Sequence, residues 1–329
     1  MNYELRIMET AFFRQTQSMS AKVDFTKECK MAINNDIKAR FGFTLVELIV
    51  VIAIIAMLIG LLVPSIQSVK RIASNLEQKS MFHGIEIGLE AFRKDFGDFP
   101  DSRRKQDNGA GPYYTGAQHL AEAMVGRDSR GFEPSQQSGR WYWPGDASSP
   151  AGLYDPADSV SLSRRKSQYI DLKGSGTFIP GELYGDPADP TVAAVGDVVS
   201  INNDQRAPVI TDLFYKKKVE TAMGELVKVG SPILYFKANR KSREFHRDSS
   251  GYGSDWIYNY DDNADVIDLG TIKDQAVVHD MDADNFYLSI SDLNAPVDSP
   301  MNENTFILIS AGYDGIYGTK DDVTNIKIK

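Results

Sequence analysis

The sequence predicts an α+β fold, in which a long N-terminal helix packs on a small antiparallel β-sheet and a long irregular insertion lies between them. Three observations predict it. An apolar run of 21 residues, 43–63, continues into a pattern of apolar residues spaced by three or four. A stretch rich in glycine and proline follows. Short segments rich in β-branched and aromatic residues then occupy the C-terminal third.

Composition excludes several classes of protein. The 329 residues carry 36 Lys and Arg against 45 Asp and Glu, a net charge of −9. We therefore expect no nucleic-acid partner, because phosphate binding needs a basic surface. The single cysteine, Cys29, excludes an internal disulfide framework and a cysteine-rich zinc site.

The run 43–63 contains only two polar residues, Thr44 and Glu47. As a helix it is roughly 30 Å long, enough to cross the hydrocarbon core of a membrane. A buried soluble helix and a cleaved secretory signal are the alternatives, but the run is long for both and residues 61–64 offer no small-residue cleavage site. Lys38 and Arg40 precede the run, which predicts a cytoplasmic N-terminus and an exported C-terminal part.

Glu47 is unusual in this run. A carboxylate within an apolar span costs several kcal/mol unless it is paired, and such residues are functional by default. The simpler alternative is that the side chain only reaches to the membrane surface.

Residues 38–48 read KARFGFTLVEL: a basic leader ending in glycine, followed by Phe-Thr-Leu-x-Glu-Leu opening an apolar helix. This pattern resembles the type IV prepilin family, which includes the pseudopilins of type II secretion. The resemblance implies a pilin-like fold, cleavage after Gly42 by prepilin peptidase and N-methylation of Phe43. It also implies that Glu47 pairs with the N-terminal ammonium of a neighbouring subunit. A 42-residue leader is long for this family, so Met1, Met19 and Met31 all stay open as the start.

The helix is expected to continue beyond the membrane. Pro64 predicts a kink that helps packing in a filament, and Gly97 and Pro100 predict the end of a helix of about 50 residues. Its outer apolar stripe is expected to pack on a sheet of the same chain. Residues 96–100 also resemble the exit of this helix in type II major pseudopilins. The stripe comprises Ile66, Val69, Ala73, Leu76, Ile85, Leu89, Phe92 and Phe96.

The stretch after the helix is predicted to be irregular apart from a short helix over 118–125. An aromatic cluster at 141–143 reads either as a small core or as a contact for a carbohydrate or partner. A structureless stretch of this length suggests an insertion with a binding or packing role. Strands are predicted at 208–215, 232–238, 305–310 and 325–329.

Residues 310–323 form a glycine-rich loop with three carboxylates between two predicted strands. Oxygen donors of this kind suit calcium, and the loop resembles the calcium-binding segment of type II major pseudopilins. By position, Asp321 is the best ligand, with Ser310, Asp314, Asp322 and the carbonyl of Tyr317 as further candidates. The alternative is an acidic hairpin without metal. The acidic runs 261–265 and 280–284 are expected to be solvated turns, and the four histidines show no metal spacing.

The sequence shows no Walker loop, no serine elbow and no HExxH motif, so we expect a structural protein and not an enzyme. The resemblance implies a homopolymer in a helical filament, the pseudopilus of type II secretion, with prepilin peptidase, an inner-membrane assembly platform and minor pseudopilins as partners. The expected location is the bacterial inner membrane with a periplasmic C-terminal domain. A minor pilin or adhesin that binds a surface or DNA, and an anchored domain that does not polymerise, are the rivals. The predicted parts are a cleaved leader 1–42, a membrane and filament-core helix 43–63, an exported amphipathic helix 64–97, an insertion 98–206, and a sheet with the acidic loop 207–329.

Overall fold

The structure is a computed structural model. It describes residues 43–106, 113–127, 129–134, 154, 159–172, 176–184, 208–220, 225–249, 253 and 255–326. The chain divides into two compact units, residues 1–59 and 60–329. The predicted leader, the processing residue Gly42 and the aromatic cluster 141–143 lie outside the described residues.

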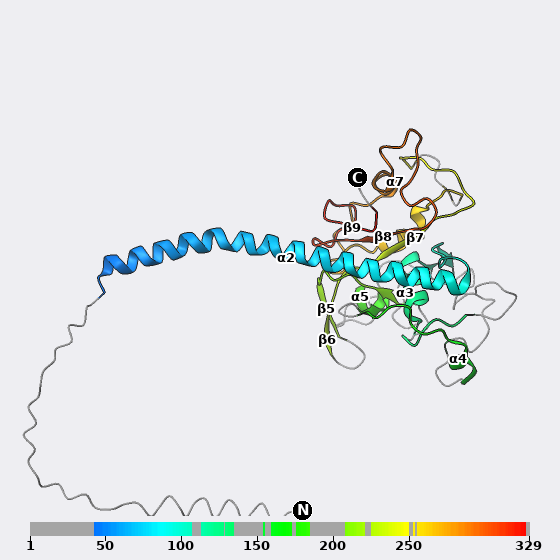
Figure 1. The fold of residues 1–329 in the computed structure, drawn as a ribbon, viewed down its shortest axis with the longest axis horizontal. Helices are drawn as coiled ribbons and strands as arrows, with labels where there is room; N and C mark the ends of the chain where they lie inside the picture. Colours follow the sequence, from blue (N-terminus) through cyan, green and yellow to red (C-terminus); the bar gives the residue numbers. More distant parts are fainter. Residues whose placement is uncertain are drawn as a thin grey trace, which may run out of the picture. The chain divides into compact units, whose positions relative to one another are not determined.

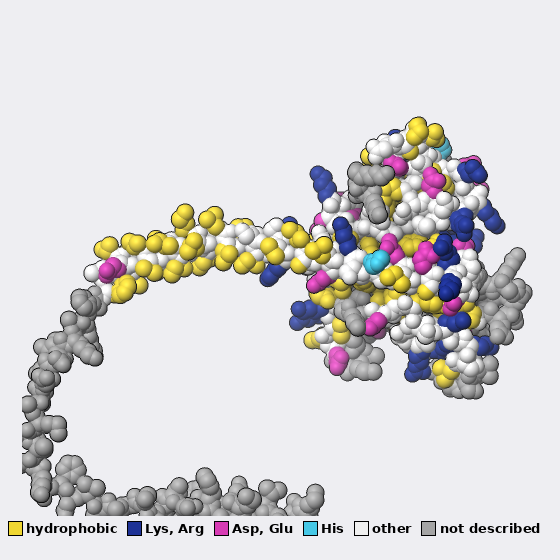
Figure 2. Space-filling view, viewed as in Figure 1, with side chains coloured by type: hydrophobic (Ala, Val, Ile, Leu, Met, Phe, Trp, Pro, Cys, Tyr) yellow, Lys and Arg dark blue, Asp and Glu magenta, His cyan; other side chains and the backbone are white. Residues whose placement is uncertain are grey.

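Helix α2, Leu45–Phe96, is 52 residues long and confirms the predicted helix (Figure 1). The helix continues through Pro64. It ends where Gly97 takes a positive φ of 84°, a conformation that favours glycine, and the Gly97 amide donates to the carbonyl of Arg93. The first half of α2 displays hydrophobic side chains on its surface (Figure 2).

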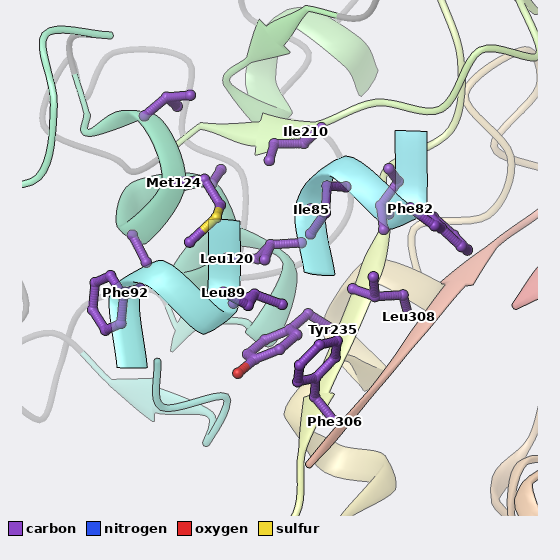
Figure 3. Close-up of a cluster of buried hydrophobic side chains, with 14 of the residues drawn as sticks. Phe82, Ile85, Leu89, Phe92, Leu120, Met124, Ile210, Tyr235, Phe306 and Leu308 are labelled. Atoms are coloured by element: carbon purple, nitrogen blue, oxygen red, sulfur yellow. The ribbon is translucent and has the colours of Figure 1, made fainter. Parts of the chain in front are cut away.

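Only the later half of the expected apolar stripe is buried. Phe82, Ile85, Leu89 and Phe92 lie in the core of the 60–329 unit and contact side chains of the sheet and of α3, as labelled in Figure 3. The earlier half was predicted to pack on the sheet as well, and this is wrong: Val69 and Leu76 are 64% and 63% exposed. Buried residues on α2 begin only at Gln78; before it, Arg71 of the helix lies 4.7 Å from the Tyr313 ring.

The central sheet is antiparallel with the order β7-β8-β9, formed by Leu234–Lys237, Phe306–Ser310 and Val323–Thr324. This confirms the α+β class. Alternate residues of a strand point to opposite faces, and both faces of this sheet are covered. One face belongs to the cluster that includes the α2 residues, and the other packs under α7, Ala283–Ile290, where the Phe236 and Phe286 rings are 4.5 Å apart.

The last strand lies earlier than predicted. β9 begins at Val323, directly after the acidic loop, whereas the prediction placed the strand at 325–329. The Asn325 side chain takes the place of a backbone acceptor, because its Oδ1 accepts from the Leu308 amide at 2.9 Å. Regular pairing therefore stops before Asn325, and residues 327–329 lie outside the described part.

The segment expected to be an insertion contributes a central helix. Helix α3, Gly116–Val125, confirms the helix predicted at 118–125, and all of its residues are buried. Thr115 and Gln118 form a capping box at its start. α3 packs on β7, so this part of the chain belongs to the core of the 60–329 unit. The other short elements here are β1 Lys105–Gln106, β2 Tyr113–Tyr114, α4 Ser159–Arg164, β3 Thr177–Phe178 and α5 Pro180–Tyr184.

Some of the remaining elements were predicted in part and others not at all. β4, Val209–Ile210, pairs with β3 and accounts for part of the strand predicted at 208–215. A separate hairpin pairs β5, Lys217–Glu220, with β6, Leu226–Val229. The acidic run 261–265 falls in the short helices η2, Tyr260–Asp262, and α6, Ala264–Ile267, and the run 280–284 leads into α7, whose N-cap is Asp282. Asp262 is buried, so the expectation of a solvated turn is wrong for that residue.

Candidate assembly motif and acidic turn

The start of α2 is a reciprocal capping arrangement between Thr44 and Glu47. Glu47 Oε2 accepts from the Thr44 backbone amide at 2.9 Å and from its hydroxyl at 2.8 Å. The Glu47 amide donates to Thr44 Oγ1 at 3.2 Å. This is the capping box of a Thr-x-x-Glu sequence, in which each residue satisfies a backbone amide that the helix leaves without a partner.

The capping box gives Glu47 a second role that the sequence analysis missed, although the Thr-x-x-Glu spacing before an apolar run was a readable signal. The carboxylate reaches back to Thr44, the residue after Phe43. It is therefore held close to the position where cleavage after Gly42 would create a new N-terminus. Pairing of Glu47 with the ammonium of another subunit stays a prediction.

The apolar residues that follow Glu47 are exposed in the described chain. α2 is the one described helix that is long and apolar enough to cross a membrane, by length and composition alone, and its most apolar stretch buries nothing. Phe43 is 77% exposed. An apolar surface of this extent marks a membrane or protein contact. Pro64 lies just after this stretch, and Ser65 Oγ donates to the Leu61 carbonyl at 3.0 Å beside it.

The second predicted site is the turn between β8 and β9. Gly312, Gly315 and Gly318 have φ values of 63°, 80° and 93°, so each sits where a side chain would strain the backbone. The turn folds back on itself: the Asp314 amide donates to Asp321 Oδ2 at 2.9 Å and the Gly318 amide donates to Asp322 Oδ2 at 2.8 Å. We call residues 310–323 the acidic turn.

Carboxylates in the acidic turn influence one another. Burial raises the pKa of Asp322 to about 8, and the charges of Asp321 and Asp314 add to this rise. Burial and the proximity of Asp321 also raise the pKa of Asp314. Hydrogen bonds from Thr319 and Asp314 outweigh burial at Asp321 and lower its pKa. The turn therefore brings three carboxyl groups together in a partly buried place.

A family model described as the prokaryotic N-terminal methylation motif matches residues 37–63. The match covers Gly42 and Phe43, where cleavage and methylation are predicted, together with Glu47 and the apolar run. The N-terminal part of the chain is prepilin-like. Comparison with curated proteins and with solved structures found no match. The motif family is structural and not enzymatic, and one apolar N-terminal helix fits a single-pass membrane protein.

The two remaining predicted ligands, Ser310 and Tyr317, make hydrogen bonds to residues outside the acidic turn. The Ser310 hydroxyl is buried and donates to Asp212 Oδ2 at 2.8 Å. Tyr317 is buried, with its amide donating to His279 Nδ1 at 3.1 Å and its hydroxyl donating to the Pro232 carbonyl. Both residues hold the base of the acidic turn in place.

The carboxylates of the acidic turn do not by themselves form a metal-binding cluster. In the part of the chain that the structure describes, no group of three or more His, Cys, Asp or Glu side chains is arranged to hold a metal ion. Lys216 already faces the turn: its ammonium donates to the Tyr313 carbonyl and lies 4.8 Å from the Tyr313 ring. Calcium binding stays a prediction of the resemblance, and no step below depends on it.

Three residues that support the turn were missed by the sequence analysis. Asp212 accepts from the amides of Phe214 and Ser231, both at 3.1 Å, as well as from Ser310. Lys216 places its side-chain carbons against Gly315. His279 was read as one of four scattered histidines, and no local spacing in the sequence connects it or the other two to residues 310–323.

Proposed function

We propose that this chain is a pilin-like subunit that prepilin peptidase cleaves after Gly42 and that then polymerises through its apolar helix into a filament. The observation that carries the proposal is an exposed apolar helix that opens with Glu47 directly after the processing motif. Such a surface has to be covered by lipid before assembly and by other copies afterwards.

Within that class, we propose the pseudopilus of type II secretion. The subunit would be held in the inner membrane with its N-terminus cytoplasmic and its C-terminal domain periplasmic, and an assembly platform with minor pseudopilins would extract it. The Phe96–Pro100 exit of α2 and the glycine-rich acidic turn, which resemble segments of type II major pseudopilins, support this proposal.

The decisive variant is Glu47→Gln in the full-length chain, expressed with a prepilin peptidase and an assembly system. Glutamine still closes a capping box, so this change removes the charge while keeping the helix start. We expect the leader to be removed and Phe43 to be methylated, as read by intact mass, but filaments in the sheared fraction to be lost. Glu77→Gln, also on the exposed surface of α2, should assemble normally.

Filaments of Glu47→Gln at the wild-type level would overturn the assembly role of this carboxylate. A mature chain that still contains Met1, Met19 or Met31 would overturn the processing step.

A further inference from the structure

A groove of about 1020 Å³ lies between α2 and the segment that joins α7 to β8. Four acidic side chains line it and no Lys or Arg does. Two apolar side chains of the lining, Ile87 and Leu293, are 58% and 66% exposed. The acidic residues of the lining are Glu86, Glu90, Asp292 and Glu303.

These acidic side chains are only partly neutralised within the chain. Glu90 pairs with Arg93 at 2.6 Å, and Glu86 accepts from the Asn325 side chain at 3.3 Å and lies 3.5 Å from His83 Nδ1. Glu303 is exposed and has no ion pair within the described residues. The groove therefore presents negative charge beside exposed apolar side chains, which favours a basic occupant with an apolar contact.

The β5–β6 hairpin carries the complementary surface. Its inner face buries Val219 and Val229, and its outer face exposes Lys218 and Lys228, which are direct cross-strand partners. Leu226, next to them on the same face, is 68% exposed. Like charges placed opposite each other destabilise a strand pair.

Neither Lys218 nor Lys228 has an ion pair in the ranges that the structure describes. The outer face also holds Glu220, which leaves it with one net positive charge. An acidic surface on another molecule would stabilise the two lysines, and the exposed Leu226 would gain an apolar contact there.

The two surfaces lie on different sides of the 60–329 unit. In Figure 1 the hairpin lies below α2, whereas β8 and α7, which the groove segment connects, lie above it. A groove and a hairpin that are separate patches form a heterologous contact. Each copy then keeps one patch open for the next copy, so the contact extends into a chain of subunits and does not close as a two-fold dimer.

We propose that the acidic groove of one copy receives the outer face of the β5–β6 hairpin of the next copy, with Lys218 and Lys228 set against Glu86 and Glu303. This contact rests on the proposed self-assembly and names the surface that orients neighbouring globular parts. Contacts between the apolar helices hold the copies together but do not fix their relative rotation. The groove and the hairpin fix how each copy is rotated relative to the next.

Charge reversal in the full-length chain tests the contact. We expect Lys218→Glu with Lys228→Glu, and separately Glu86→Lys with Glu303→Lys, to lower the yield of shear-released filaments about tenfold, the change that about 1.4 kcal/mol produces. The chain with all four changes should recover, because the charges are exchanged. Lys241→Glu and Glu77→Lys, exposed positions outside both patches, should assemble as wild type.

A cross-link supplies an independent readout. In a Cys29→Ser background, Lys228→Cys and Glu303→Cys in one chain should give a ladder of disulfide-linked multimers, and either change alone should stop at dimers or fewer. Normal filaments from every charge variant together with no ladder would overturn this inference and leave the proposed function standing. A ladder without wild-type filaments would support the contact and overturn the filament, and the absence of both would overturn both.

Discussion

At the scale of single residues, Asp212 connects the sheet to the acidic turn. Burial raises its pKa to about 7, although hydrogen bonds from Ser310 and Phe214 and the charge of Lys216 oppose the rise. A folded-state pKa above the unfolded value means that folding favours the protonated carboxyl. Stability from this group is therefore present at low pH and is lost as pH rises towards and through 7.

We predict that the free energy of unfolding falls between pH 6.5 and pH 8, with Asp212 contributing about 1 kcal/mol. Asp212→Asn, which cannot ionise, should flatten the slope by that amount in urea titrations. Asp255→Asn, at an exposed site, is the control and should leave the slope unchanged. Equal slopes for wild type and Asp212→Asn would contradict the prediction.

At lower pH, His279 changes the free energy of unfolding in the opposite direction. Burial lowers the pKa of His279 to about 4, so its contribution to stability is lost as pH falls from about 6.5 to 4. Above about pH 7.5 this imidazole is neutral in both states, and between pH 6.5 and 7.5 its small opposing contribution is the same in wild type and in Asp212→Asn. The buried carboxyl groups of Asp262 and Glu122, with pKa values raised by burial to about 7 and 8, add to the same downward slope.

At the scale of elements, two glycines of α2 have different surroundings. Substitution of one reports on helix propensity, and substitution of the other reports on packing. A Cβ at Gly84 would meet nothing within 4 Å, whereas one at Gly88 would lie 2.6 Å from Ile170 Cγ2 and 2.9 Å from Met124 Sδ. We predict that Gly84→Ala raises the free energy of unfolding by about 1 kcal/mol. Gly88→Ala should lower it by about 1–3 kcal/mol through overpacking.

Thermal or urea unfolding of the two variants beside wild type measures both changes. Their opposite signs provide the internal control, because the substitution and the helix are the same. A stabilised Gly88→Ala chain would show that Ile170 and Met124 do not pack against α2 as described.

The same element shows how far the sequence predicts this fold. The length and ends of α2 followed from the apolar run, Gly97 and Pro100, and the positions of β7 and β8 followed from their composition. The sequence did not indicate which half of the outer apolar stripe is buried, because Val69 and Leu76 repeat with the same spacing as Ile85 and Leu89. The β5–β6 hairpin was missed because its outer face is lysine-rich, and the supports of the acidic turn lie far from it in sequence.

At the scale of the whole molecule, folding and assembly use different parts of the chain. Every buried hydrophobic residue of the described chain lies at or after Phe82, and burial on α2 begins at Gln78, whose Oε1 accepts from the Leu213 amide at 2.9 Å. The residues before Pro64 add no buried side chain to the described core. The apolar helix is therefore available for lipid or for other copies without loss of core packing.

We predict that residues 64–329 fold without the leader and the apolar span, because their removal takes no apolar surface from the described core. The truncated chain should melt at the temperature of the full-length chain in detergent, followed by near-ultraviolet circular dichroism. Residues 83–329 are the matched control: this cut also removes Phe82 and the Gln78 contact, which should cost about 3 kcal/mol or more. Aggregation of residues 64–329 without a cooperative transition would mean that the span also stabilises the exported fold, and that assembly and folding are coupled in this chain.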